Sequence, residues 1–332
     1  MKTKTLEASA HKQVRVFGGL PMLITAVVIV ALLVILPLTG VLSSNTQRYL
    51  LKIFLYCCLG SMWNLMSGHC GLTSLGQQSF IGLAGYTLAV MTAYYSLPYW
   101  MAIIVGAALS ALLALGLSLI FFQMRGMYFA VATWITAEAL KTIFTSWSFV
   151  KQGAGMTVKL KPYPSTTEIF LLSLSLAIGA TVLVHLLLRS RTGLGLSAMG
   201  NDADAASSVG VNIFKSKLIC FVLSGAVTGI AGVIFYMNKG SIFPTGGFGI
   251  DWTVSIVFIV IIGGVGTAAG PIVGSIIYVM LSEFLSKYPG YSMVILGTIA
   301  IVVIVVMPDG IVGTLQKKFK FEIMSLRRHA PE

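Results

Sequence analysis

Ten apolar runs, nearly free of charged residues, constrain the fold of this chain more than any other feature of its sequence. They lie at residues 18–42, 49–67, 80–97, 99–122, 127–147, 168–188, 216–237, 252–264, 270–286 and 291–307. A membrane-spanning helix needs about 20 predominantly apolar residues. The eighth run is short for a span, and we allow it to continue into the glycine-rich turn that follows. The pattern predicts an all-α integral membrane protein with about ten transmembrane helices.

The composition excludes the main classes of soluble protein. Charged residues make up 10% of the 332 residues and apolar residues 57%, whereas roughly a quarter of an average soluble chain is charged. A cytosolic enzyme, a disordered chain and a coiled coil are therefore ruled out. The first run is too long for the apolar core of a signal peptide, so we interpret it as an uncleaved helix. We expect an N-terminal segment at 1–17, one transmembrane domain at 18–313 and a C-terminal tail at 314–332.

The basic residues predict the orientation in the membrane. The net charge is +12. If the N-terminus is cytoplasmic, the cytoplasmic segments hold fourteen of the 22 lysines and arginines and the outer segments hold seven, with Lys141 inside a span. This bias favours cytoplasmic N- and C-termini. The basic residues are scattered over short loops, so we expect no nucleic-acid partner. The four cysteines, Cys57, Cys58, Cys70 and Cys220, lack metal-ligand spacing and read as small buried residues without disulfides.

Known nucleotide and catalytic motifs are absent from the sequence. There is no G-x-x-x-x-G-K-[ST] phosphate loop, no HExxH and no GxSxG. The stretch 264–269 fits GxGxxA, but it lies between two spans rather than in a βαβ unit. Gly266, Gly270 and Gly274 are spaced by four residues, and we expect them to let two helices approach each other closely. We expect the same of Gly225 and Gly229.

The segment 68–86, GHCGLTSLGQQSFIGLAGY, is dense in glycine and small polar residues. Irregular backbone is tolerated at membrane depth only where protein or a water-filled cavity satisfies it, and broken segments of this kind often line transport paths. Gln77, Gln78 and Ser79 could then hydrogen-bond a passing solute. The alternative is an ordinary surface loop between two spans.

Glu138 is an acidic residue deep inside a predicted span. It lies about eleven residues into the run 127–147, which at 1.5 Å per residue is roughly 16 Å, close to the bilayer midplane. A carboxylate at that depth is costly unless it is paired or hydrated. Lys141 follows three residues later on the same helical face, so Glu138 is either half of a structural ion pair or a group that lines a path. A proton relay is weakly supported, since no second carboxylate occurs at matching depth.

Two connections are long enough to have structure of their own. The hydrophilic segment 189–215 reads as a short helix on the cytoplasmic face, with alanines at helical spacing. The outer segment 150–167 contains two glycines and two prolines and reads as a structured loop.

Five blocks, in order over about residues 60 to 313, carry a resemblance to a known family. They resemble blocks of the permease subunits of branched-chain amino acid ABC importers, in particular the longer of the two paralogous permeases. The blocks are Asn64–Tyr86, residues 125–138 (R-G-M-Y-F-A followed by Thr133, Ala137 and Glu138), the loop Arg189–Asn212, Gly263–Pro271 (GGVGTAAGP) and Pro308–Gly313 (PDGIVG).

The resemblance implies an all-helical permease with a ten-helix, type II ABC importer-like fold in a bacterial cytoplasmic (inner) membrane. The implied partners are a paralogous permease, two ATP-binding subunits that bind the ATP and Mg²⁺, and an extracytoplasmic solute-binding protein. The chain itself would hold no cofactor or metal and catalyse no reaction. On this view Asn64, Gln77, Ser79, Thr133 and Glu138 lie near the solute path. The helix Asp202–Gly210 receives the push of the ATPases, and its coupling residues are Asp202, Ala205, Ala206 and Gly210.

Departures from the family pattern leave the solute open. Leu72 stands where the family usually has Gln, Gln77 where it has His, and Asp309 where it has a basic residue; residues 150–155 and 200–202 also differ. Branched-chain or other hydrophobic amino acids are the first expectation, and urea or short amides are the alternative. From other classes, an ion-coupled secondary transporter would need ionisable residues in several spans, and a membrane-embedded enzyme would need a catalytic cluster that is not visible.

Overall fold

The computed structural model describes residues 15–17, 20–124, 126–201, 203–208, 210–288, 290–319 and 321–323. Each of the ten predicted runs forms a helix, with ends shifted by a few residues. These helices are α1 (Leu20–Leu38), α2 (Ser44–Asn64), α3 (Gln77–Tyr94), α4 (Tyr99–Phe121), α5 (Met127–Ser146), α6 (Thr166–Arg189), α9 (Ile213–Lys239), α11 (Asp251–Gly263), α12 (Gly270–Leu285) and α13 (Ser292–Val306). The all-α membrane fold is confirmed.

Shorter elements join these helices. They are the π-helix η1 (Leu65–His69), the 3₁₀ turn η2 (Ser148–Val150), α7 (Arg191–Asn201), α8 (Ala203–Ser208), α10 (Pro244–Gly247), α14 (Gly310–Phe319) and the strands β1 (Arg15–Phe17), β2 (Met156–Thr157), β3 (Ser241–Ile242) and β4 (Phe321–Ile323). β1 pairs in parallel with β4, and β2 pairs antiparallel with β3.

Six segments of the described chain are long and apolar enough to cross a membrane. They are Ser44–His69, Tyr99–Phe121, Thr166–Arg189, Ile213–Lys239, Pro244–Gly263 and Val294–Lys318. Their outer faces are apolar, as in Leu112, Leu119 and Leu186, which suits contact with lipid tails. The chain is a multi-pass membrane protein.

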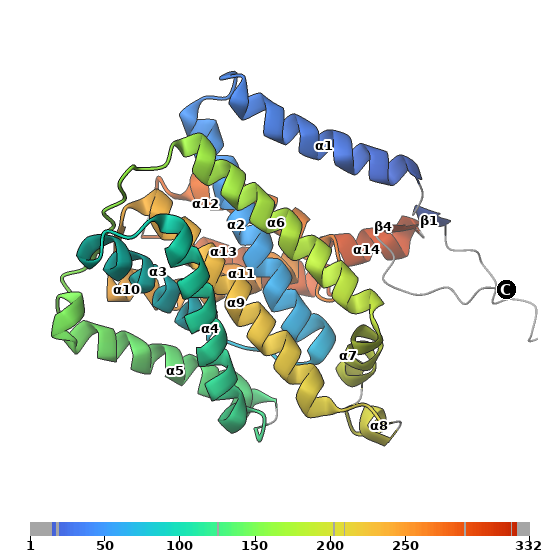
Figure 1. Cartoon of the computed structure of the whole chain (residues 1–332). Helices are drawn as coiled ribbons and strands as arrows, with labels where there is room; N and C mark the ends of the chain where they lie inside the picture. The colour runs from blue at the N-terminus through green and yellow to red at the C-terminus, as the bar shows by residue number, and fades with distance from the viewer. Residues whose placement is uncertain are drawn as a thin grey trace, which may run out of the picture.

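Helix α9 forms the centre of the bundle and packs on α2, α3, α4 and α6. Figure 1 shows α5 at the edge of this bundle, and α7 and α8 beyond one end of α6 and α9. We call this end of the bundle the α7 end and the opposite end, where β2 and β3 lie, the β end.

Small residues allow α9 to approach its neighbours closely. A Cβ atom on Gly229 would lie 2.4 Å from Oγ of Ser110 in α4, and one on Gly225 would lie 3.1 Å from Cβ of Ala114. A Cβ on Gly274 of α12 would lie 2.0 Å from the carbonyl oxygen of Ile259 in α11. The packing role predicted for Gly225, Gly229 and Gly274 is confirmed. Gly266 was predicted wrongly, because it lies in the turn between α11 and α12 with φ of 75° rather than on a helix.

Two details differ from the sequence-based expectation. The eighth run does not continue into the glycine-rich turn: α11 ends at Gly263, because Gly264 has φ of 120° and breaks the helix. The apolar segment extends instead toward its N-terminus, through α10. The segment 189–215 forms two helices rather than one, since α7 precedes α8. All four cysteines are buried and free of disulfides, as expected.

Candidate functional site

A break in the helical backbone between α2 and α3 organises the candidate site. Helix α2 ends in the wide turn of η1, residues 71–76 are non-helical, and α3 begins at Gln77. Several backbone groups that the break leaves without helical hydrogen bonds find side-chain partners inside the bundle. Nε1 of Trp63 donates to the Ser74 carbonyl at 2.8 Å, and the Leu75 amide donates to Oγ1 of Thr133 at 3.0 Å. Protein side chains thereby satisfy an irregular backbone that lipid could not.

Thr133 fixes this break to α5. Its hydroxyl accepts from Leu75 and donates to the Ala130 carbonyl at 2.8 Å, and the residue is 3% exposed. Gly76 lies directly against it, because a Cβ there would come within 2.3 Å of the Thr133 carbonyl oxygen. Only glycine allows α5 to come so close to the break.

A set of buried polar side chains, which we call the central polar cluster, surrounds the first turn of α3. Its members are Gln77, Gln78, Ser79, Thr228 of α9 and Thr253 of α11, and each is at most 2% exposed. Thr228 donates to Oε1 of Gln77 at 3.2 Å, and Thr253 donates to Oε1 of Gln78. Nε2 of Gln78 and Oγ of Ser79 are buried without a hydrogen-bond partner. Such groups are costly when they are buried without a partner, so the cluster is only partly satisfied within the described residues.

Asn64 ties the C-terminal end of α2 to the turn between α11 and α12. Its Nδ2 donates to the Thr267 carbonyl at 2.9 Å, and its Oδ1 accepts from the Gly266 amide at 2.7 Å. The side chain is 3% exposed. Both ends of the amide are therefore used in holding the glycine-rich turn, and Asn64 acts as a clamp between two parts of the bundle.

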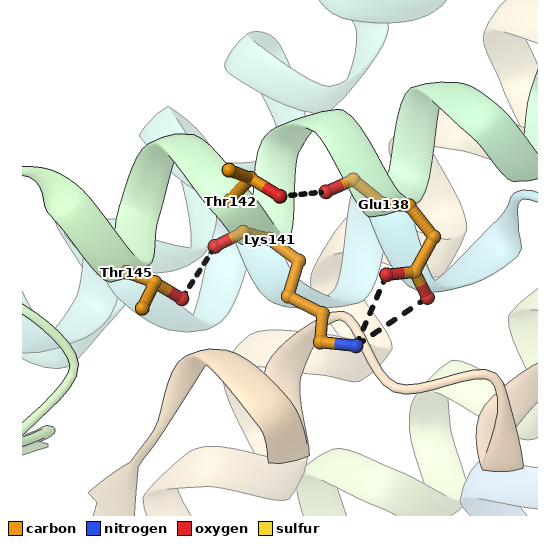
Figure 2. A network of polar contacts seen from close by, with 4 residues as sticks. All are labelled: Glu138, Lys141, Thr142 and Thr145. Atoms are coloured by element: carbon orange, nitrogen blue, oxygen red, sulfur yellow. Dashed lines mark hydrogen bonds and ion pairs between the residues drawn. The ribbon is translucent and has the colours of Figure 1, made fainter.

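Glu138 lies apart from these buried groups, on a half-buried side of α5. Its carboxylate pairs with Nζ of Lys141 at 3.0 Å, and the two side chains are 37% and 31% exposed. Figure 2 shows the pair projecting from α5, while Thr142 and Thr145 bond to helix carbonyls. Helix α5 thus has a buried face, with Thr133, and an open face with a charged pair between exposed side chains such as Ile135.

The predicted coupling segment lies at the α7 end. Ala206 is buried in α8, and Gly210 adopts φ of 88° in the turn toward α9. Asn212 caps α9, because its Oδ1 accepts from the Lys215 amide at 3.0 Å. Ala205 lies within α8, and Asp202 lies outside the described residues.

The structure brings four of the five predicted path residues into the interior of the bundle and leaves Glu138 half-buried, paired with Lys141. Gln77 and Ser79 belong to the central polar cluster, Thr133 contacts the break beside it, and Asn64 clamps the neighbouring turn. Thr228 and Thr253 were not predicted from the sequence, although hydroxyl residues in otherwise apolar spans are a usable signal. In the part of the chain that the structure describes, no group of three His, Cys, Asp or Glu residues could hold a metal ion.

Comparison with known proteins supplies an independent view of this arrangement. The model of the family described as branched-chain amino acid transport system / permease component matches residues 45–306. The chain is 24% identical over 298 residues to the high-affinity branched-chain amino acid transport system permease protein LivM of Salmonella typhimurium, covering 81% of this chain and 70% of the relative. It is 23% identical to LivM of Escherichia coli over 310 residues, which cover 84% of this chain and 73% of the relative.

A shorter relative matches only part of the chain. The probable branched-chain amino acid transport permease protein LivH of Methanocaldococcus jannaschii is 29% identical over 144 residues, which is 41% of this chain and 45% of the relative. The similarity to LivM is therefore the more extensive of the two. No solved structure matches the chain.

Proposed function

The chain belongs to the branched-chain amino acid transport permease family, and on that premise we propose that it forms half of the membrane path of an ABC importer for branched-chain or other hydrophobic amino acids. The family match over residues 45–306 carries this proposal. The LivM relatives of Salmonella typhimurium and Escherichia coli are branched-chain amino acid transport permeases. The break between α2 and α3 supports it, since irregular backbone inside a bundle is typical of transport proteins.

The proposed assembly needs four further kinds of component. A paralogous permease completes the path, two ATP-binding subunits supply the energy, an extracytoplasmic solute-binding protein delivers the solute, and the lipid bilayer surrounds the permeases. The chain has no phosphate-loop motif, so ATP and Mg²⁺ bind to the partner subunits. Both termini, and with them the α7 end, face the cytoplasm of a bacterial cell.

The open face of α5 is the part of the chain that we place along the path. An acid and a base at this depth would be costly against lipid tails. Against a second permease, with a water-filled path between them, the pair stays hydrated and the cost falls. Glu138 and Lys141 also suit a zwitterion, because the carboxylate can attract the ammonium group of an amino acid and the ammonium of Lys141 its carboxylate.

The coupling step is assigned to α7, α8 and the turn at Gly210. These elements lie beyond the ends of α6 and α9. A push on α7 reaches α6 and η1 directly, since α7 packs on both. Because η1 leads into the break between α2 and α3, the movement arrives at the central polar cluster without passing through the lipid-facing helices.

Uptake by reconstituted vesicles tests the proposal. Vesicles with the complete transporter are given a leucine-loaded solute-binding protein, and ATP-dependent uptake is measured for Glu138→Gln beside wild type. We expect impaired uptake with normal assembly, because the neutral amide leaves Lys141 without its counter-charge. Glu168→Gln is the matched control, since Glu168 is an exposed carboxylate in the first turn of α6.

Three results would contradict parts of the proposal. Normal uptake by Glu138→Gln would show that the pair is only structural. Uptake of urea without uptake of leucine would reassign the solute class. Uptake driven by an ion gradient in the absence of ATP would replace the importer with a secondary transporter.

A further inference from the structure

A cavity near the α7 end lies between three segments of the bundle. Its walls come from the end of α2 with η1, from the second half of α6, and from the glycine-rich turn that leads into α12. The enclosed part has a volume of about 10 Å³, enough for one water-sized group. With the open space at its mouth the cavity measures about 330 Å³. It can therefore take one small group of a larger ligand.

Two histidines line this cavity, and each has a buried nitrogen atom without a partner. Nε2 of His69, at the end of η1, and Nδ1 of His185, in α6, form no hydrogen bond with any of the described residues. A buried polar atom left without a partner is costly. Because both imidazoles border the same small space, one bound group can serve both.

The other polar side chains of the lining are already used. The Ser61 hydroxyl donates to the Cys57 carbonyl at 2.8 Å, and the Thr181 hydroxyl donates to the Ala177 carbonyl at 2.8 Å. Both ends of the Asn64 amide hold the glycine-rich turn. The two histidines are therefore the polar groups of this lining that remain for a ligand.

The N-terminal end of α12 also borders the cavity. Ala268 and Pro271 of the lining lie on either side of Gly270, the first residue of this 16-residue helix. The first hydrogen bond of the helix runs from the Val273 amide to the Ala269 carbonyl at 3.1 Å. The amides before it carry the positive end of the helix dipole, which stabilises a bound anion.

The charged groups near the cavity favour an anion over a metal ion. Among the described residues, no Asp or Glu belongs to the lining. Arg189 follows His185 by one turn on the same face of α6. Asp309 lies beyond the glycine-rich turn, where its backbone faces Gly264, and its carboxylate is paired with Lys317. Two imidazoles beside a positive charge and a helix N-terminus are a poor site for a cation.

The position of the cavity suits a phosphate group. Arg189 ends α6, and His185 lies four residues deeper, or about 6 Å along the helix axis. Val182 and Leu186, on the neighbouring face of α6, are apolar and 49% and 63% exposed, so this face meets lipid tails. A headgroup phosphate at the end of α6 can therefore reach the cavity from the side, and a free phosphate ion can reach it from the aqueous phase.

We propose that this cavity is a phosphate-binding site, in which a phosphate oxygen accepts hydrogen bonds from the imidazoles of His69 and His185. The phosphate group belongs either to an anionic phospholipid or to inorganic phosphate, since both present the same kind of oxygen atom. The bound group joins α6, η1 and the turn before α12. Because α7 packs on α6 and η1, the ligand stiffens the route that we assign to the coupling movement, and this consequence alone rests on the function proposed above.

Binding to the complete transporter tests the site without any need for transport. The complex is stripped of lipid in maltoside micelles, which contain no phosphate. In one arm phosphatidylglycerol is added and counted per complex by native mass spectrometry. In the other arm radiolabelled inorganic phosphate is added and measured by equilibrium dialysis. We expect the wild type to bind one of the two probes at this site, once per copy of this chain.

Replacing both His69 and His185 by leucine should weaken that binding by at least about tenfold, because the ligand loses two hydrogen bonds to a charged group. Ala268→Leu is a second variant, which fills the cavity and leaves both imidazoles in place, and we expect it to lose the same binding. Gln123→Leu is the matched control, since Gln123 is an exposed polar residue after α4 and outside the cavity.

Three outcomes would overturn the site. The first is that the wild type binds neither probe, which leaves only water for the cavity. The second is equal binding of the probes by the wild type and both cavity variants, with subunit assembly intact. The third is a preference for Zn²⁺ over both probes that is lost in the double variant, because the site would then be one for a cation. Binding of a probe by a complex that takes up no leucine would support the site and contradict the proposed function, whereas normal leucine uptake without such binding would do the reverse.

Discussion

Replacing Asn64 by alanine removes few atoms, but we expect it to destabilise the bundle markedly. The substitution removes two hydrogen bonds, from Asn64 to the Thr267 carbonyl and from the Gly266 amide to Asn64, at 2.9 and 2.7 Å. Each such bond contributes about 1 kcal/mol net, and the loss is larger where the remaining group is left buried without a partner. With the side chain 3% exposed, we expect a cost of about 2 to 3 kcal/mol.

Unfolding of the purified chain in mixed micelles, followed by tryptophan fluorescence, measures this cost. Ser61→Ala is the control: Ser61 is a buried residue one turn earlier in α2, and its hydroxyl donates to the Cys57 carbonyl of its own helix. We expect that variant to lose less than about 1 kcal/mol. A loss below about 0.5 kcal/mol in Asn64→Ala would refute the clamp, since it would mean that water replaces both bonds.

Two further substitutions test the packing of α9 and the coupling segment. Gly229→Leu should prevent α4 from approaching α9 and abolish stable insertion of the protein. Gly179→Leu in α6 should be tolerated, because a Cβ there has nothing within 4 Å. Equal expression of the two variants would refute the close contact between α4 and α9. Gly210→Arg should abolish uptake while ATP hydrolysis continues. Gly210→Asn should preserve coupling because asparagine tolerates positive φ, and normal uptake by the arginine variant would remove the coupling role.

The positions of the helices were predictable because apolar runs determine them directly. The run 99–122 became α4 at Tyr99–Phe121, and the run 127–147 became α5 at Met127–Ser146. The glycine pairs were predictable for the same reason, since spacing by four residues places both on one helical face. Hydrophobicity and local spacing are enough to recognise such features.

The features of the fold and of the candidate site that could not be predicted depend on contacts between distant residues, which no local pattern encodes. The sequence marks Asn64 as a polar residue near the path, but it cannot show that both ends of its amide are used on a turn about 200 residues away. The pairing of Met156 with Ile242 was likewise unforeseen, because strands of two residues have no periodicity to detect. The wide turn Leu65–His69 also carries no signal distinct from the helix before it.

The composition of the complex tests the central claim most directly. The tagged chain is purified from gently solubilised native membranes, and the proteins that accompany it are identified. We predict a second permease of the same family together with one or two kinds of ATP-binding subunit that contain a phosphate loop. Recovery of this chain alone, as a stable oligomer that transports solute without those subunits, would contradict the importer and leave Glu138 and Lys141 as the candidate groups of an ion-coupled transporter.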